Sequence, residues 1–276
     1  MLRWPTVLTA ATAAGIAASG AESLTLRKRV REIPIPGLPR ELEALTILHV
    51  SDVHAGFGPG LTLLRRCTEW AAELEPDLVA VTGDLVARRS AARAFATAAS
   101  ELAATARHGA YAVLGNHDRA RGRDPFAQGW NAGDLAGLQL LDGAATEVSL
   151  NGRRISVAGA SADRHFREPG YDPSAHLDVS ADLRILLCHF PDVLSRLTAG
   201  WAHLVLAGHL HGGQICVPWP GGRLGLAHPR SGPPTALEAR DGTVMHVSPG
   251  IGTTFVPLRF LAQPEVTLLR LYSQPR

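Results

Sequence analysis

Residues 45–54 read LTILHVSDVH, a short apolar run that passes directly into an aspartate and a histidine. An apolar run of this length that ends in polar residues is typical of a buried strand. The apolar residues of the next segment, 61–74, recur at helical spacing. The stretch therefore predicts a strand followed by a helix, with Asp52 and His54 where the strand ends.

The same alternation of strand and helix continues along the chain. Short, nearly continuous apolar runs between helices are characteristic of sheets that are covered on both faces. We therefore expect an α/β protein. Further buried strands are predicted at residues 78–81, 111–114, 155–158, 184–188, 204–207, 244–247 and 266–271, and an alanine-rich helix at 91–106. Residues 119–175 and 212–242, rich in Gly, Pro, Asp and Arg, are expected at the surface.

Side chains that bind metals follow five of these predicted strands. In open α/β sheets the active site lies at the carboxyl ends of the strands. Alternate residues of an extended segment point the same way, so Asp52 and His54 can reach one ion. Carboxylate and amide oxygens mixed with imidazoles suit a pair of transition-metal ions that share one carboxylate. The candidate ligands are Asp52, His54, Asp84, Asn116, His189, His209 and His211.

Three glycines directly precede candidate ligands. Gly83, Gly115 and Gly208 each stand at a predicted strand exit. We expect them there because the backbone must turn sharply to aim the following side chain inward.

The composition excludes several classes of protein. Of 276 residues, 46% are hydrophobic and 19% charged, which excludes a disordered chain. A net charge of +2 lacks the basic excess that a nucleic-acid groove needs, so nucleic acid is an unfavoured partner. Three cysteines without Cys-x-x-Cys spacing indicate neither a thiolate zinc site nor a disulfide framework.

The N-terminus has the pattern of a targeting segment. Residues 4–21 carry no charge and end in small residues, as in a signal peptide or a short membrane anchor, although a plain helical tail also fits. A basic cluster follows at Arg27, Lys28, Arg29 and Arg31. It would keep the main domain cytoplasmic beside a retained anchor, whereas a cleaved signal would export the domain. The cluster suits anionic lipid head groups or a solvated linker.

The polar motifs resemble the signature of the calcineurin-like metallophosphoesterase family, in its order. They are Asp52-x-His54, Gly83-Asp84, Gly115-Asn116-His117-Asp118, a lone His189 and Gly208-His209-x-His211. The resemblance extends from about residue 45 to the C-terminus. It implies a four-layer α/β/β/α sandwich with two mixed sheets, built as one catalytic domain over residues 32–276, after an N-terminal segment and linker over residues 1–31.

The resemblance also implies a role for each residue. Asp52, His54 and His211 would hold one metal ion, Asn116, His189 and His209 the second, and Asp84 would bridge both. The cofactors would be two divalent transition-metal ions, Mn²⁺, Fe²⁺/³⁺ or Zn²⁺, whose bridging hydroxide attacks phosphorus. His117 would be the catalytic histidine, and Asp118 would orient it.

The motif details point to a subgroup of the family. Protein serine/threonine phosphatases carry Gly-Asp-x-Val-Asp-Arg-Gly, whereas residues 83–89 here read GDLVARR. The segments GHLHGGQ at 208–214 and SPGIGTT at 248–254 resemble the bacterial envelope-associated phosphodiesterases. This subgroup implies a membrane-associated or exported hydrolase of phosphodiester or pyrophosphate bonds, with a lipid-linked or envelope substrate. The alternatives are a phosphodiesterase of soluble nucleotides or nucleic acid, and a metal-binding interaction protein without catalysis.

Several other residues are given simpler interpretations. His49, His203 and His246 lie in predicted strands and are expected in the core or at its edge. We expect residues 119–175 to form one wall of the substrate cleft. Trp219 suits a substrate groove, a lipid contact or a packed loop, and the sequence leaves the oligomeric state open. His108, His165, His176 and His228 are expected in loops, and Arg119, Arg121 and Arg123 either near substrate phosphate or in solvent.

Overall fold

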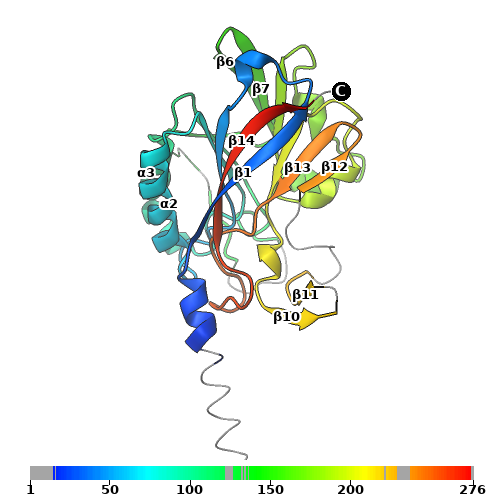
Figure 1. Ribbon diagram of the computed structural model, residues 1–276. Coiled ribbons are helices and arrows are strands. Elements are labelled where there is room, and N and C mark those ends of the chain that lie inside the picture. The colour runs from blue at the N-terminus through cyan, green and yellow to red at the C-terminus, as the bar shows by residue number, and fades with distance from the viewer. Residues whose placement is uncertain are drawn as a thin grey trace, which may run out of the picture.

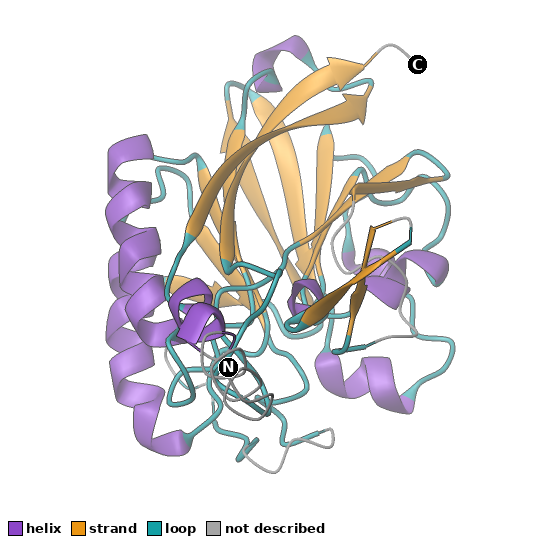
Figure 2. Cartoon of the chain, turned by 60° about the horizontal axis from the view of Figure 1, so that its bottom comes forward, coloured by secondary structure: helices purple, strands orange, loops and turns teal. Residues whose placement is uncertain are grey.

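Two six-stranded sheets form the centre of the molecule (Figures 1 and 2). The computed structural model describes Gly15 and residues 17–121, 127–131, 133, 135, 137–220, 222–228 and 237–274. The first sheet has, in spatial order, β1 (Arg27–Pro36), β14 (Glu265–Gln274), β2 (Thr46–Val50), β3 (Leu78–Thr82), β4 (Ala110–Val113) and β5 (Leu138–Leu140). The second has β12 (Leu237–Arg240), β13 (Thr243–Val247), β9 (Leu204–Ala207), β8 (Leu183–Leu187), β7 (Arg153–Gly159) and β6 (Ala144–Leu150).

Both sheets are mixed. In the first, β14 is antiparallel to β2 and the other neighbours are parallel. In the second, the outer pairs β12–β13 and β6–β7 are antiparallel and the inner pairs are parallel. The parallel strands β2, β3 and β4 of one sheet and β8 and β9 of the other are those that precede candidate ligands.

Helices cover the outer face of each sheet and complete four layers (Figure 2). The helices α2 (Gly60–Leu74) and α3 (Ala92–Ala103) pack on the first sheet. Shorter pieces pack on the second, namely α4 (Ala162–Arg167), η3 (Pro173–His176) and η4 (Pro191–Ser195). Three further 3-10 turns, η1 (Arg40–Leu42), η2 (Arg89–Ala91) and η5 (His211–Gly213), lie in loops. The four-layer α/β/β/α fold expected from the sequence is confirmed.

Alternating side chains of the strands build two apolar layers. One fills the space between the sheets, where Ile47 and Ala80 of the first sheet meet Ile155 and Leu204 of the second. The other lies under the helices, and the regularly spaced apolar residues of the 61–74 segment, Leu63, Leu64, Cys67, Trp70 and Ala71, are all buried there. The apolar runs of the sequence therefore correspond to strands buried on both faces, as predicted.

Four strands of the two large sheets, β1, β5, β6 and β12, lie where the sequence was expected to form a linker or a surface excursion. Residues 27–31, expected in the basic linker, form the first half of β1, whose basic residues Arg27 and Arg29 lie 3.8 Å and 3.3 Å from Glu265 of β14. The excursion over residues 119–175 contains β5 and β6, besides the buried β7 that was predicted at 155–158, and the excursion over 212–242 contains β12. The strands β1, β5, β6 and β12 are the four edge strands of the two sheets, and an edge strand does not need the long apolar run of a strand buried on both faces.

Little of the predicted N-terminal segment is described. Residues 1–14 and 16 lie outside the described part of the chain, and with them most of the expected signal or anchor. Within the described ranges, no helix combines the length and apolar character needed to cross a bilayer. A hairpin of β10 (Cys216–Trp219) and β11 (Gly222–Gly225) projects near the described N-terminal residues (Figure 1).

A buried histidine pair joins the two sheets. The Nδ1 atoms of His49 on β2 and His246 on β13 are 2.9 Å apart, and His49 Nε2 is 2.8 Å from Thr82 Oγ1. Burial lowers the pKa of His49 to about 3 and also holds the pKa of His246 well below its usual range. Both are core histidines, as predicted, and His203 is half-buried at the edge.

The pair gives folding stability a defined pH dependence. An unfolded histidine has a pKa near 6.5, so below that pH the unfolded chain binds protons that the folded rings reject. The free energy of unfolding is expected to fall as the pH decreases from about 6.5 toward 3, by roughly 1.4 kcal/mol per pH unit for each ring. Denaturant unfolding of metal-free protein at a series of pH values measures this slope.

The double variant His49→Leu/His246→Leu tests the origin of the slope. It removes both titrating rings together, so neither is left without its partner. Its unfolding free energy should depend less on pH between 6.5 and 4 than that of the wild type. An identical slope in both proteins would contradict the assignment.

Candidate metal centre

Strand topology gathers the candidate ligands at one edge of the sandwich. The loops after β2, β3 and β4 carry Asp52, Asp84 and Asn116. The loops after β8 and β9 of the second sheet carry His189 and His209. Because these strands are parallel within each sheet, their carboxyl ends meet at the same edge.

The first cluster of ligand atoms consists of Asp52, His54, Asp84 and His211. All four offer atoms that lie within 4.8 Å of one another, and all four residues are buried. His211 Nε2 is 3.3 Å from Asp52 Oδ1 and 3.1 Å from His54 Nε2. His54 Nε2 is in turn 3.5 Å from Asp84 Oδ2.

The second cluster shares Asp84 with the first and adds His189 and His209. His189 Nε2 is 3.2 Å from Asp84 Oδ2 and 3.2 Å from His209 Nδ1. Asn116 lies beside them, where its amide Nδ2 donates to the Arg121 carbonyl at 3.2 Å and its buried Oδ1 has no hydrogen-bond partner. A buried acceptor without a donor is costly unless a cation satisfies it.

These observations fit two metal ions. Each cluster mixes imidazole nitrogen with carboxylate oxygen, a donor set that suits divalent transition metals. Asp84 belongs to both clusters. The structure thus brings six of the seven predicted ligands together, in two groups around one shared carboxylate, and the seventh, Asn116, directly precedes His117, whose N–H donates to Asp84.

The ligand loops owe their shape to left-handed backbone conformations. The φ angles are 52° at Asp52, 47° at His54, 51° at Asp84, 73° at His209 and 51° at His211. Such angles are unfavourable for residues other than glycine and occur where function or packing requires them. The prediction that Asp52 and His54 converge is confirmed, but the reason given for it was wrong. The segment is not extended, because both residues have left-handed backbone.

The glycines before the candidate ligands are explained mainly by the close approach of other residues to their backbone, and less by sharp turns. Gly83 has a φ of +80°, as expected for a sharp turn. Gly115 and Gly208 do not lie in this region, but an added Cβ would collide with the Asp84 carboxylate at Gly115 and with Ser51 and Asp52 at Gly208. Here hydrogen takes the place of a side chain so that a ligand can pack directly on the backbone.

The imidazoles determine the charge state of the shared carboxylate. Burial opposes ionisation of Asp84, but His189 and His117 outweigh it and hold the pKa of Asp84 well below its usual range. Burial likewise opposes charge on His189, yet the adjoining Asp84 raises the pKa of His189 to about 9. At Asp52, where burial dominates, the pKa rises to about 6.

Neighbouring backbone and hydroxyl groups orient the ligands. His189 Nδ1 is 2.8 Å from the Thr82 carbonyl, which can only accept, so Nδ1 keeps its hydrogen and Nε2 is the atom that would lose its proton to a metal ion and bind it. Ser51 Oγ lies 2.6 Å from Asp52 Oδ2. On the far side, the fully buried Arg259 donates to the carbonyls of His211 and Gly252 at 3.1 Å and 2.8 Å.

The predicted catalytic pair separates into two roles. His117 Nε2 is 3.9 Å from Asp84 Oδ2, so its ring lies at the metal centre. The carboxylate of Asp118 accepts hydrogen bonds from the backbone N–H groups of Leu85, Val86 and Gly115 and from the indole of Trp130. These bonds hold the loop that carries Asp84 in place, and the orienting of His117 by Asp118 stays a prediction.

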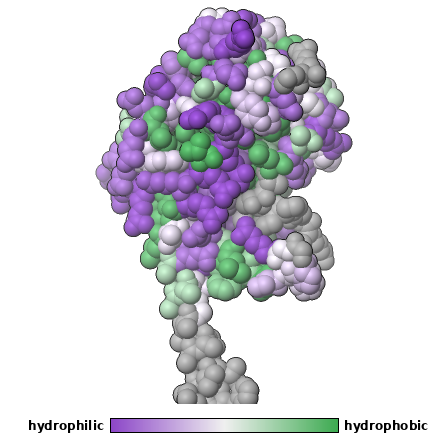
Figure 3. All heavy atoms as spheres, viewed as in Figure 1, coloured by the Kyte–Doolittle hydropathy of each residue, from purple (hydrophilic) through white to green (hydrophobic). Residues whose placement is uncertain are grey.

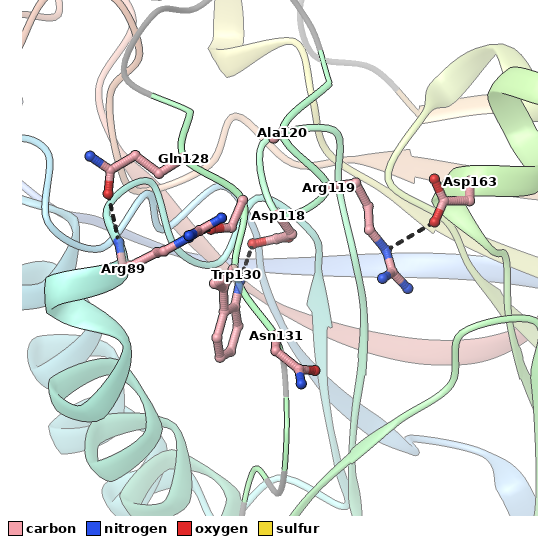
Figure 4. Close-up of a pocket in the computed structure, with 9 residues that line it drawn as sticks. Arg89, Asp118, Arg119, Ala120, Gln128, Trp130, Asn131 and Asp163 are labelled. Carbon is pink, nitrogen blue, oxygen red and sulfur yellow. Dashed lines mark hydrogen bonds and ion pairs between the residues drawn. The ribbon is translucent and has the colours of Figure 1, made fainter.

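Two cavities flank the centre. A cavity of about 650 Å³ includes Asp118, Arg119, Trp130 and Asp163, with Arg89 opposite Arg119 (Figure 4). Another, of about 610 Å³, includes the ligand His209 and the aromatic rings of Phe166 and Phe190. The two ends of the segment 119–175 therefore line cavities beside the site, as expected of a cleft wall, whereas its middle lies in the sheets.

The sequence arguments missed or misplaced three residues near the centre. His165 lies in α4, buried, with its ring stacked 4.3 Å from that of Phe190, and not in an open loop. His228 does lie in a loop, but its ring is 4.3 Å from that of His209. Arg259 supports His211 from 48 residues away. In the sequence each of these three residues is an isolated polar residue, and its distance from the metal-binding motifs follows no recognisable pattern.

Arg119 and Arg121 both pair with Asp163, at 3.4 Å and 3.2 Å. Both guanidinium groups are therefore paired with carboxylates in this structure. This differs from the two expectations from the sequence, namely contact with a substrate phosphate and full exposure to solvent. Arg123 lies outside the described residues.

A methyl group at Gly208 should disrupt the first ligand cluster. In Gly208→Ala the new Cβ would collide with Ser51 Oγ and press on the Asp52 carboxylate. Overpacking of this kind costs about 1–3 kcal/mol. We expect at least a tenfold loss of metal affinity, measured by elemental analysis after dialysis against graded Mn²⁺. Gly170→Ala, in open space, is the control. Wild-type affinity in Gly208→Ala would show that close approach is unimportant.

Sequence comparisons agree with this geometry. The chain is 29% identical over 244 residues to the uncharacterized metallophosphoesterase YkuE of Bacillus subtilis, covering 86% of this chain and 82% of that protein. It is 28% identical over 227 residues to phosphodiesterase YaeI of Escherichia coli, covering 82% and 81%. It is 24% identical over 324 residues to the UDP-2,3-diacylglucosamine pyrophosphatase LpxG of Chlamydia trachomatis, covering 98% and 96%.

Other relatives are longer, and the chain spans only 52% to 64% of their lengths. A family model for calcineurin-like phosphoesterases matches residues 45–213, which include all seven candidate ligands and His117. With two ligand clusters around one shared aspartate at the strand ends of a four-layer sandwich, the chain belongs to the calcineurin-like phosphoesterase family of metal-dependent enzymes.

Proposed function

We propose that this enzyme is a two-metal hydrolase of phosphodiester or pyrophosphate bonds that acts on a lipid-linked substrate at the bacterial envelope membrane. The observation that carries the proposal is the pair of ligand clusters that share Asp84, with the His117 ring beside them. This arrangement suits a reaction that needs two adjacent cations and one proton-transferring group.

The residues divide the work of the site. Asp52, His54 and His211 would hold one divalent ion and Asn116, His189 and His209 the other, with Asp84 between them. Manganese, iron or zinc suits these donors. When bound, the two ions supply Lewis acidity and a nucleophile at neutral pH.

His117 would move the proton. Its backbone N–H donates to Asp84 Oδ1 at 2.8 Å, which ties the position of this residue to the shared ligand. Its imidazole can donate a proton to the oxygen that leaves phosphorus, or stabilise charge on the phosphoryl group. Asp118 and Trp130 support this loop from behind through the 2.8 Å bond between them.

The names of two relatives favour a phosphodiester or pyrophosphate substrate, and the N-terminal sequence favours a substrate linked to lipid. The relatives YaeI and LpxG are named as a phosphodiesterase and a UDP-2,3-diacylglucosamine pyrophosphatase. The uncharged residues 4–21 would bring the domain to a membrane. A soluble nucleotide is the alternative substrate, and nucleic acid is disfavoured by the net charge of +2.

The first test compares a chromogenic phosphodiester with the matching monoester. Protein stripped of metal and reconstituted with Mn²⁺, Fe²⁺ or Zn²⁺ should cleave the diester faster, because the proposal assigns the site to diesters. The stripped protein should be silent, and His209→Ala should lose at least 100-fold in kcat because it lacks one ligand of the second cluster. A folded, metal-loaded protein that cleaves neither the chromogenic esters nor a lipid-linked pyrophosphate would contradict the proposal.

The second test isolates the proton transfer by His117. The variant His117→Asn should bind two metal equivalents like the wild type, yet lose about 10²- to 10⁴-fold in kcat. The loss should be larger for an alkyl leaving group than for nitrophenolate, because a poor leaving group needs the proton more. His108→Asn, an exposed histidine outside the site, is the matched control. An equal loss with both leaving groups would exclude the general-acid role.

A further inference from the structure

We infer that an exposed apolar surface beside the metal centre docks onto a lipid bilayer and holds the entrance of the site at the level of the lipid head groups. This inference rests on the proposed function, since it explains how a lipid-linked substrate would reach the metals. We call this surface the apolar rim. It consists of Val217, Trp219, Leu224, Leu226, Phe255, Val256 and Leu261.

Exposed apolar side chains are concentrated in the rim. Of the fourteen large hydrophobic side chains that are exposed in the described part of the chain, seven belong to residues 217–226 and 255–261. Trp219 is 62% exposed and Phe255 51%. Single exposed apolar residues are ordinary, but a gathering of them in two short segments marks a surface that meets something apolar.

Hydrogen bonds join the two segments into one surface. The backbone N–H of Cys216, at the start of β10, donates to the Phe260 carbonyl at 2.8 Å. The Gln214 side chain donates to the carbonyls of Thr254 and Val256 at 2.7 Å and 3.0 Å. Arg223 of β11 also donates to the Leu261 carbonyl.

The rim is built on a loop that carries a metal ligand. The turn η5 begins at His211, and only two residues separate it from β10. Arg259 donates to the His211 carbonyl at 3.1 Å and to the Ala262 carbonyl at 3.0 Å, so one buried side chain holds both the ligand loop and the rim. Whatever meets the rim therefore lies next to the metal centre.

The N-terminal segment reaches the domain at the same place. Glu22 accepts hydrogen bonds from the N–H groups of Leu261 and Ala262 at 2.9 Å and 2.7 Å, and Ser23 accepts from that of Arg259 at 2.6 Å. The uncharged residues 4–21 precede these contacts directly. Figures 1 and 3 show the described N-terminal residues and apolar side chains near the hairpin at the same end of the molecule.

Strand directions lead to the same conclusion. The strand β1 is parallel to β14, and β14 is antiparallel to β2. The start of β1 therefore lies at the edge where β2 ends and Asp52 follows. The segment that precedes β1 leaves the domain at the metal edge.

The charge pattern favours a bilayer over a protein partner. Residues 214–228 and 248–262 contain arginine at 223 and 259 but no aspartate or glutamate. The two segments thus contribute no acidic group, and the nearby Glu22 carboxylate is already bonded to the N–H groups of Leu261 and Ala262, so repulsion from anionic lipid is small. Trp219 stands between two prolines near the tip of the hairpin, and an exposed indole is the side chain most typical of the membrane–water interface.

Fluorescence quenching tests the contact directly. The full chain is mixed with vesicles of phosphatidylethanolamine and phosphatidylglycerol, with and without brominated acyl chains, which quench tryptophan at short range. Trp219→Phe should remove part of the quenching that the wild type shows. Trp201→Phe, which replaces the 36% exposed tryptophan three residues before β9 and so at the opposite edge, should leave that quenching unchanged. Equal quenching in wild type and Trp219→Phe would overturn the inference.

Charge insertion supplies a functional readout. Trp219→Glu should cleave a soluble chromogenic diester like the wild type but hydrolyse a lipid-linked pyrophosphate in the same vesicles at least tenfold more slowly. Trp201→Glu should affect neither reaction. Equal hydrolysis of the vesicle substrate by wild type and Trp219→Glu would contradict the docking role.

The two proposals fail in different ways. If metal-loaded wild type hydrolyses no diester or pyrophosphate, the proposed function fails, while the quenching experiment still decides whether the rim meets lipid. If the rim instead covers a second copy of the chain, sedimentation without vesicles will show a wild-type dimer and a Trp219→Glu monomer. That result would overturn lipid docking.

Discussion

The structure depends on one buried carboxylate, that of Asp84, which lies among imidazoles from four separate loops. An isolated charge in this position would be strongly destabilising. His54, His117 and His189 compensate for it, and the backbone of His117 donates to its other oxygen. Through these contacts, loops from both sheets meet at the Asp84 carboxylate. The packing at this edge of the sandwich and the charge of the site therefore depend on the same group.

The sequence predicted most of the architecture for a simple physical reason. Strands buried on both faces need uninterrupted apolar runs, and helices packed on a sheet need a recurring apolar face, so β2, β3, β8, β9, α2 and α3 were all visible in advance. The sequence also pointed to the residues of the two clusters, because their motifs follow directly after those runs. Edge strands such as β1 and β6 were missed because one side of each faces solvent.

The sequence could not reveal the backbone conformation at the candidate ligands, nor which residues far away in the chain hold these ligands in place. The sequence of residues 51–54 alone does not indicate the left-handed backbone at Asp52 and His54. Backbone hydrogen bonds to Gly83, Asp84 and Gly252, all distant in the sequence, accompany that shape. Asp118 was expected to orient His117, and its hydrogen bonds to three backbone amides and an indole were not foreseen. Arg259 supports His211 although 48 residues separate them, a contact that only tertiary structure creates.

The position of β14 has a consequence for when the protein can fold. This strand follows every other described strand in the chain, yet it lies between β1 and β2 and pairs with both. The first sheet therefore stays incomplete, with the edge of β2 open, until β14 has been synthesised. A nascent chain that still lacks β14 leaves the facing backbone N–H and C=O groups of β1 and β2 unpaired, and both strands reach their native pairing in one step when β14 inserts between them.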